Sequence, residues 1–259
     1  NDNVNKISLN VETGNIKGLK KWLYFPMYYK RLKVHLKKIN PDVVISFLFL
    51  TNIVGVFCCK KLHIPIILSE RNDPREYGNK QKKVMKYVYP KSNGFVCQSN
   101  VVKEYIEEEY GIENSVVIEN PLNENQVGKI NDKKDNQIIS VGRLIPQKNF
   151  GLLIDAFEEV TSDMPEFKLT IYGEGFLREE LENKIKKLGL NKKVSLPGNK
   201  KDVIKINNKA KIFVLSSDFE GYPNVLAEAM ANGLVCIASD VPSGTTRQII
   251  KHGVNGFLY

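Results

Sequence analysis

The chain has 259 residues, of which 42% are hydrophobic and 26% charged, and this composition excludes a disordered or fibrous protein and favours one or two globular domains. The four cysteines and three histidines lack metal-ligand spacing, so we expect buried thiols and no metal site. The net charge of +9 is uneven, since residues 1–135 hold 22 Lys or Arg against 15 acids and residues 136–259 hold 16 against 14.

The first forty residues are basic and aromatic. Lys6–Val11 is predicted to be a strand, and residues 16–40 hold eight Lys or Arg and no acid among many aromatic side chains. Pro26 interrupts this stretch, and a helix is predicted from about Met27 to Lys38. Cations and rings together are typical of a segment at an anionic membrane surface. A surface helix whose aromatic side chains enter the core is the alternative.

The uncharged run Val43–Cys59 is predicted to be a buried strand over Asp42–Leu50 and a helix from about Asn52 to Leu62. At 17 residues it is short for a membrane span, which is the alternative. The chain opens with a polar segment rather than a signal peptide. We therefore expect a cytoplasmic protein, peripheral at the inner face of the plasma membrane.

A strand at Pro65–Ser69 runs into a polar segment whose residues Glu70, Arg71 and Asn72 stand at its carboxyl end. Ligands of parallel sheets bind at that end, so these are candidate site residues, with a polar turn that caps a helix as the alternative. Further elements are predicted in alternation, namely a helix at Lys80–Tyr89, a strand at Phe95–Gln98, a helix at Val101–Tyr110 and a strand at Val116–Ile118.

Residues 122–136 are polar with few apolar anchors, which is typical of a linker. We therefore predict two domains, 1–125 and 136–259. The second alternates strands and helices, as parallel α/β sheets do. Its strands are predicted at Gln137–Val141, Lys168–Tyr172, Val194–Leu196, Ile212–Leu215, Leu234–Ala238 and near Gly256–Tyr259, and its helices at Gly151–Val160, Leu177–Leu188, Asp202–Ala210 and from Pro223 to Gly233.

The segment from Ile212 to Ser239 concentrates the chemistry. Glu220 lies in the loop before the Pro223 helix and Glu228 lies inside it, so both could face one pocket beside the helix N-terminus. A carboxylate suits sugar or ribose hydroxyls, because its two oxygens accept hydrogen bonds from a vicinal diol. Two exposed glutamates on an ordinary helix are the alternative. The Gly173-Glu174-Gly175 loop lacks the third glycine of a dinucleotide fingerprint, since Arg178 stands in its place.

The pair of glutamates in EGYPNVLAEAMANG resembles the signature of retaining glycosyltransferases of family 4, the glycosyl transferases group 1. The resemblance extends to VGRLIPQKN at 141–149, IYGEG at 171–175 and NGFL at 255–258. SERNDP at 69–74 is similar to a stretch of bacterial members that build surface polysaccharides on a polyprenyl diphosphate carrier. Glu70 departs from the pattern, because many relatives place a histidine there.

The resemblance implies the GT-B fold, two Rossmann-like parallel-sheet domains facing a cleft, with the nucleotide sugar bound by the second. Arg143 and Lys148 would stabilise the leaving diphosphate, Glu220 would face the transferred sugar and Glu228 the ribose. The remaining donor-binding positions would be Gly142, Gly173, Gly198, Gly221, Tyr222, Asn224 and Val225. Glu70, Arg71 and Asn72 would lie on the acceptor side. No cofactor is expected beyond the donor, which the resemblance suggests is a UDP-sugar.

The predicted partners are a nucleotide sugar, a lipid-linked or saccharide acceptor and an anionic membrane surface. Nucleic acid is not expected, because the basic excess lies away from any reading motif. Relatives begin with a strand and a glycine-rich loop, and they end with helices that return to the first domain. We therefore expect a fragment with an incomplete first domain and little activity. A non-catalytic sugar-nucleotide or membrane-surface binding module and a GT-B-like UDP-sugar epimerase are the alternatives.

Overall fold

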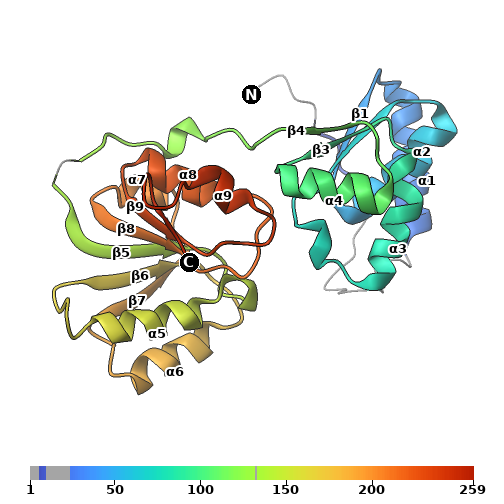
Figure 1. Cartoon of the computed structure of the whole chain (residues 1–259). Coiled ribbons are helices and arrows are strands. Elements are labelled where there is room, and N and C mark those ends of the chain that lie inside the picture. Colours follow the sequence, from blue (N-terminus) through green and yellow to red (C-terminus); the bar gives the residue numbers. More distant parts are fainter. Residues whose placement is uncertain (1–5, 10–23, 132) are drawn as a thin grey trace. The chain divides into compact units, whose positions relative to one another are not determined.

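The structure, a computed structural model, describes residues 6–9, 24–131 and 133–259. The chain divides into two compact units, Asn1–Ile118 and Glu119–Tyr259. Each unit is an α/β fold built around its own parallel sheet (Figure 1).

The first unit has a four-stranded sheet of order β1-β2-β3-β4, and every pairing in it is parallel. Its apolar core is formed by the inward faces of the helices and by the alternate strand residues that meet them. The strands are β1 (Val44–Phe47), β2 (Ile66–Ser69), β3 (Gly94–Cys97) and β4 (Ser115–Val117), and the helices are α1 (Phe25–Ile39), α2 (Phe49–Leu62), α3 (Asn79–Val88) and α4 (Asn100–Tyr110).

The uncharged run after residue 42 forms a strand and a helix as predicted, but the strand is not buried and the boundary between the two was also predicted wrongly. Because β1 is an edge strand, Ile45 and Phe47 are 57% and 42% exposed. Leu48 has a φ of 71°, which ends β1 and lets α2 begin at Phe49. The helix is apolar because both of its sides are covered, and Val56 and Cys58 are fully buried. Among the described residues, no helix combines the length and apolar character needed to cross a bilayer. The strand predicted at Lys6–Val11 does not form over residues 6–9, and residues 10–11 lie outside the described ranges.

The second unit has a six-stranded sheet of order β10-β9-β8-β5-β6-β7, again parallel throughout. The alternation predicted for this half is confirmed, with β6 at the expected residues. The strands are β5 (Asp135–Val141), β6 (Lys168–Tyr172), β7 (Val194–Gly198), β8 (Ala210–Leu215), β9 (Val235–Ala238) and β10 (Phe257–Leu258), and the helices are α5 (Phe150–Val160), α6 (Arg178–Lys187), α7 (Val203–Ile206), α8 (Asn224–Ala231) and α9 (Thr245–Ile249).

Helices cover both faces of this sheet, α5 and α6 on one face and α7, α8 and α9 on the other (Figure 1). Each face has its own apolar cluster, with Ile154 and Leu181 in one and Leu226 and Ala229 in the other. The central strands are thus mostly covered on both sides, which explains their apolar runs. The four cysteines are buried and carry no disulfide.

Two predictions in this unit were wrong in detail. The helix expected over Asp202–Ala210 is only the short α7, because the Asn207 side chain donates to the Val203 carbonyl (2.8 Å) and Ala210 already belongs to β8. The helix α9 after β9 was not expected, since the segment reads as a Ser-Gly-Thr turn.

Residues predicted to link the two domains belong to the second unit instead. The Gln126 amide donates to Asp202 (2.7 Å), and the Gly128 N–H donates to the Asn232 side chain (2.8 Å). The Asn131 amide donates to the Asn208 side chain (2.8 Å). The division therefore falls between Ile118 and Glu119, before the predicted domain end at residue 125. This segment is held by amide groups rather than by apolar side chains. Its composition is therefore polar, and for that reason it was predicted to be a linker.

Candidate active site

Three loops meet at the carboxyl edge of the second sheet, because β5, β8 and β9 are neighbours in it. They are residues 142–149 after β5, 216–223 after β8 and 239–244 after β9. The hydroxyl of Ser239 donates to the Ser217 carbonyl and joins two of these loops. This edge is where most of the predicted site residues lie.

The central contact of this edge is an ion pair between Lys148 and Glu220. The Lys148 ammonium donates to Oε1 of Glu220, and the two side chains are only 14% and 9% exposed. The Ser217 hydroxyl donates to the same oxygen (2.6 Å). Two residues predicted on separate grounds are thus brought together, in a setting where charge is weakly screened by solvent.

The loops carrying this pair are joined by four further hydrogen bonds. The Ser216 hydroxyl donates to the Lys148 carbonyl (2.8 Å), and the Asp218 N–H donates to the Gln147 carbonyl (2.9 Å). The amides of Gln147 and Asn149 donate to the Phe219 carbonyl and the Asp218 carboxylate, each at 2.8 Å. Gln147 and Ser217 were not predicted as site residues, because single polar side chains in loops carry no spacing signal.

The donor-binding positions predicted at Gly221, Tyr222, Asn224 and Val225 lie just before α8 and in its first turn. The Asn224 N–H donates to the Tyr222 carbonyl (3.0 Å), and the Asn224 side chain accepts from Asn120 (2.8 Å). The Asn224 N–H is therefore engaged within the chain. Burial raises the pKa of Tyr222, and the nearby Glu119 raises it further.

Glu228 lies one turn into α8, half-buried, and burial raises the pKa of its carboxyl group. The backbone carbonyl of Glu228 accepts from the Asn232 side chain (2.8 Å), which holds the end of the helix. Its carboxylate thus sits on a rigid element, on the helix that follows the Glu220 loop. A half-buried carboxylate of this kind is suited to hydroxyl groups of a bound ligand.

Glycines bring the loop after β5 against the loop after β6. Gly173 has a φ of 150°, and a Cβ there would lie 1.8 Å from the Gly142 carbonyl oxygen. The Gly142 N–H donates to the Tyr172 carbonyl (2.9 Å). Both predicted glycines therefore serve a close backbone approach that positions Arg143. Arg143 is exposed, and among the described residues no contact joins its side chain to Glu220 or Glu228.

Arg178 connects the loop after β6 with the end of β7. Its guanidinium donates to the Gly173 carbonyl (3.3 Å) and the Leu196 carbonyl (3.1 Å) and pairs with the carboxylate of Glu174 (2.7 Å). A Cβ on Gly198, which has a φ of 82°, would lie 2.7 Å from the Glu174 carboxylate. In the sequence, Arg178 stands out only because it replaces a glycine of the dinucleotide fingerprint, whereas in the structure its guanidinium holds two loops together.

The acceptor-side candidates lie in the first unit, at the end of β2. Glu70 is 3% exposed and accepts hydrogen bonds from Asn52 (3.0 Å), Tyr77 (2.8 Å) and Tyr89. Burial raises the pKa of its carboxyl group, and the three donors oppose that effect. Arg71 lies over the Phe47 ring, 4.8 Å from its centroid.

Asn72 contacts the Tyr77 hydroxyl at the margin of hydrogen bonding, 3.5 Å away. Of the three acceptor-side candidates, Arg71 and Asn72 therefore lie at the end of the strand while Glu70 holds that end in place from inside.

Across residues 6–9, 24–131 and 133–259, no group of three or more His, Cys, Asp or Glu side chains could hold a metal ion.

Comparisons with known families and proteins identify the proteins that this chain resembles. The profile of the family described as Glycosyl transferases group 1 matches residues 123–259, and that of Glycosyltransferase Family 4 matches residues 6–126. The first match covers the whole carboxyl edge described above.

Relatives are found in bacteria and archaea. The chain is 30% identical over 231 residues to a GalNAc-alpha-(1->4)-GalNAc-alpha-(1->3)-diNAcBac-PP-undecaprenol alpha-1,4-N-acetyl-D-galactosaminyltransferase of Campylobacter jejuni, covering 88% of this chain and 63% of the relative. It is 30% identical to an uncharacterized glycosyltransferase of Methanocaldococcus jannaschii, covering 96% of this chain and 70% of that relative. The chain spans 62–65% of the length of three curated relatives.

A solved structure has the same fold. The Anabaena protein Alr3699/HepE, in complex with UDP and glucose, matches with a TM-score of 0.80 and 20% identity, covering 93% of this chain and 69% of that one. The two parallel-sheet units therefore have the GT-B fold.

Proposed function

The chain belongs to the family Glycosyl transferases group 1, and on that premise we propose that it is part of a retaining glycosyltransferase. The enzyme moves a sugar from a nucleoside diphosphate donor, a UDP-sugar, to a lipid-linked or saccharide acceptor in bacterial surface polysaccharide synthesis. The Campylobacter relative, whose name specifies an undecaprenyl-diphosphate acceptor, supports the acceptor class. The Anabaena protein of the same fold, which holds UDP and glucose, makes UDP the first donor nucleotide to test.

The observation that carries this proposal is the contact between Lys148 and Glu220 at the carboxyl edge of the second sheet. When the glycosidic bond breaks, the leaving diphosphate gains negative charge. The ammonium of Lys148 is already fixed beside the site by Glu220, so it stabilises that charge without reorganisation. Arg143, on the same loop, supplies a second positive charge.

Glu220 accepts hydrogen bonds from the transferred sugar, and Glu228 accepts them from the ribose hydroxyls. The backbone around Gly221, Tyr222 and Val225 holds the diphosphate at the start of α8, where N–H groups lack intrahelical acceptors. No further cofactor is proposed, because Arg143 and Lys148 supply the positive charge that a divalent cation supplies in other transferases.

Arg71 and Asn72 form the acceptor side, at the end of β2. A lipid-linked acceptor is anchored in a bilayer, so we propose a cytoplasmic protein that is peripheral at the inner face of the plasma membrane.

Calorimetric titration with UDP, GDP and ADP tests the donor assignment. We expect UDP to bind most tightly, and Glu228→Ala to weaken it by roughly tenfold or more, because a charged hydrogen-bond acceptor is lost. Glu159→Ala removes an exposed glutamate at the end of α5 and is the matched control. Equal affinity in wild type and Glu228→Ala would remove Glu228 from the ribose role, and no nucleotide binding at all would overturn the proposal.

Turnover separates the remaining alternatives. A transferase consumes the donor in proportion to the acceptor that is added. Conversion of a UDP-sugar without acceptor would indicate an epimerase, and nucleotide binding without any turnover in the full-length protein would indicate a binding module.

A further inference from the structure

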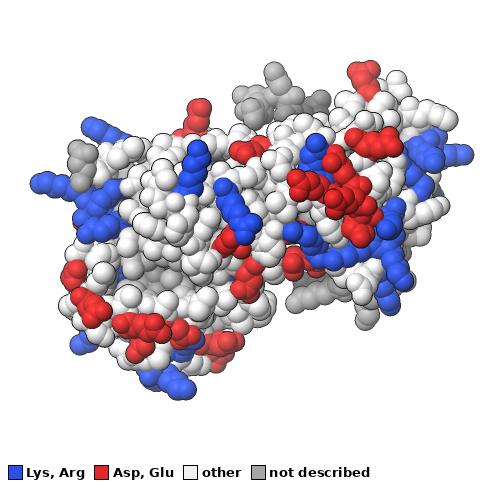
Figure 2. Space-filling model, viewed as in Figure 1, with Lys and Arg blue, Asp and Glu red and all other residues white. Residues whose placement is uncertain are grey.

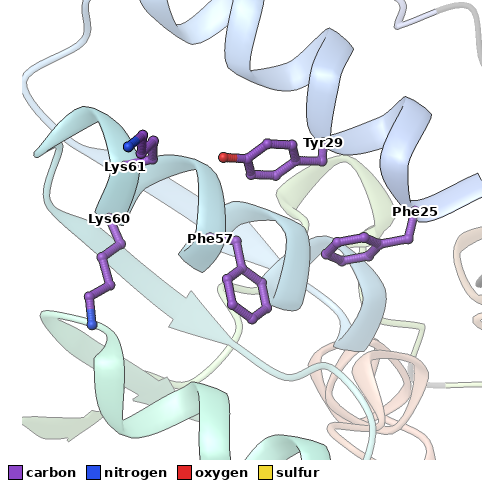
Figure 3. Close-up of a pocket in the computed structure, with 5 residues that line it drawn as sticks. All are labelled: Phe25, Tyr29, Phe57, Lys60 and Lys61. Carbon is purple, nitrogen blue, oxygen red and sulfur yellow. The ribbon is translucent and has the colours of Figure 1, made fainter.

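A pocket of about 480 Å³ opens between α1 and α2 of the first unit. It is lined by Phe25 and Tyr29 of α1 and by Phe57, Lys60 and Lys61 of α2. The aromatic side chains project from both helices into the space between them, and Lys60 and Lys61 extend from α2 in different directions (Figure 3). Phe25 and Phe57 meet edge to face at 6.0 Å. The pocket therefore has carbon walls and cations on its α2 side.

The helices that form the pocket carry positive charge only. Helix α1 contains five Lys or Arg and α2 contains two, and neither contains an acid. The acidic side chains of this unit gather over α4 instead, while basic ones line the edge where α1 and α2 lie (Figure 2). An occupant of the pocket thus meets cations without any competing carboxylate on the two helices.

The outward face of α1, away from the pocket, also combines lysines with an exposed apolar side chain. Lys30, Val34, Lys37 and Lys38 follow helical spacing and are exposed, Val34 by 61%. Phe57 of α2 is 38% exposed, although its neighbours Val56 and Cys58 are fully buried. Exposed apolar side chains between lysines fit the interface of an anionic bilayer, where rings enter the acyl boundary and ammonium groups meet the phosphates.

We propose that the α1–α2 pocket binds an anionic membrane phospholipid, with one acyl chain against Phe25, Tyr29 and Phe57 and the phosphate beside Lys60 and Lys61. A free phosphate would leave the aromatic walls unused. Charge complementarity favours the lipid, because the site offers cations beside an apolar slot. This inference rests on the membrane location proposed above and is independent of the donor chemistry.

Flotation tests the proposal with vesicles of phosphatidylcholine alone and of phosphatidylcholine mixed with phosphatidylglycerol. We expect the chain to float with the mixed vesicles only, and less so at high salt. Lys60→Glu/Lys61→Glu should weaken partitioning by roughly 25-fold, since each basic residue near the surface contributes roughly fivefold. The matched control, Lys186→Glu/Lys187→Glu, reverses a lysine pair in the last turn of α6 and should leave flotation unchanged.

A second variant addresses the acyl chain. Phe57→Ser should reduce partitioning by roughly tenfold, the effect of removing one apolar side chain from a non-aqueous environment. Phe176→Ser, at a residue 76% exposed in the second unit, is its control. In a titration with monomeric dihexanoyl phosphatidylglycerol, the NMR resonances of Phe57 should shift until binding saturates in wild type. The same titration should cause no saturable shift in Lys60→Glu/Lys61→Glu.

Several outcomes would overturn this assignment. One is that the Lys60→Glu/Lys61→Glu and Phe57→Ser variants float with the vesicles to the same extent as their control variants. Another is self-association through Phe57 in light scattering without vesicle binding, which would make the pocket an interface between copies. Capture of an acidic peptide in place of lipid would also contradict it. UDP calorimetry on the same variants should match wild type, so a failure here is distinct from a failure of the donor assignment.

Discussion

Lys148 and Glu220 lie 72 residues apart in the chain, yet the ammonium of one donates to the carboxylate of the other. The contact is possible because β5 and β8 are neighbours in the sheet, although three helices and two strands separate them in sequence. Each residue lies in the loop that follows the carboxyl end of its strand, so the strand order places the two loops side by side.

A double-mutant cycle on this pair should show strong coupling. We expect Lys148→Met and Glu220→Gln to couple by roughly 1–3 kcal/mol in the free energy of unfolding of the second unit, because either single change leaves a weakly solvated charge alone. The exposed pair of Lys184 and Asp155 is the control, with coupling below about 1 kcal/mol. Urea denaturation measures both cycles. Equal coupling free energies in the two pairs would show that burial does not strengthen the contact between Lys148 and Glu220.

Lys148→Ala should lower turnover more than it lowers donor affinity. A lost group that stabilises developing charge costs roughly 10²–10³ in kcat. Lys184→Ala, which removes an exposed lysine of α6, should leave kcat at the wild-type value. Steady-state kinetics with saturating UDP-sugar makes the comparison in the full-length protein. An unchanged kcat in Lys148→Ala would refute the role of this lysine at the diphosphate.

UDP affinity should fall as the pH is lowered through the pKa of Glu228. Burial raises that pKa, so the carboxyl group takes up a proton at a higher pH than an exposed glutamate does. A protonated carboxyl group accepts hydrogen bonds from ribose less well. Calorimetry across the acidic range should show this loss in wild type and a flatter profile in Glu228→Gln. A decline of equal size in both proteins would assign the pH dependence to another group.

Glu70 should be tolerant of amide replacement and intolerant of truncation. Glu70→Gln keeps an oxygen for Asn52 and Tyr89 and offers an N–H to the Tyr77 hydroxyl, whereas Glu70→Ala leaves three buried donors unsatisfied. Each unsatisfied donor costs roughly 1–3 kcal/mol, so the alanine variant should lower the free energy of unfolding of the first unit and raise its hydrogen exchange. Hydrogen exchange of peptides containing β2 and β3 reports on that unit alone.

The pH dependence of the Glu70 contribution follows from its raised pKa. The folded state holds the proton more tightly than the unfolded state, so wild-type stability falls as the pH rises from the unfolded pKa of the carboxyl through its folded pKa. Glu70→Gln lacks this titration and should gain relative to wild type over that window. A wild-type stability that rises with pH relative to Glu70→Gln would contradict the sign.

Arg178→Lys should weaken UDP binding without unfolding the chain. A lysine cannot reach the Gly173 and Leu196 carbonyls together with Glu174, so the loops after β6 and β7 lose their common brace. Two lost hydrogen bonds correspond to roughly tenfold in affinity. Glu182→Ala, which removes only the exposed contact of Arg178, is the control. Equal UDP affinity in both variants would show that Arg178 only supports α6.

Local pattern was sufficient for most elements of the fold. The alternation of apolar runs with 3.6-residue periods predicted β6 at its observed residues and α5 to within one residue. Hydrophobic pattern did not predict where two of the elements end. Asn207 ends α7 through a side-chain contact, and Leu48 ends β1 through a positive φ, and neither is visible in hydrophobic spacing.

The sequence by itself determined the alternating strands and helices, and it located Lys148 and Glu220 in loops after strands and Glu228 inside the following helix, because hydrophobic periods and turn residues act over a few positions. Only the tertiary structure decided that Lys148 pairs with Glu220, that Arg178 braces two loops and that Glu70 is enclosed by Asn52, Tyr77 and Tyr89. These contacts depend on strand order and helix packing, which are fixed by the burial of the whole core rather than by any short segment.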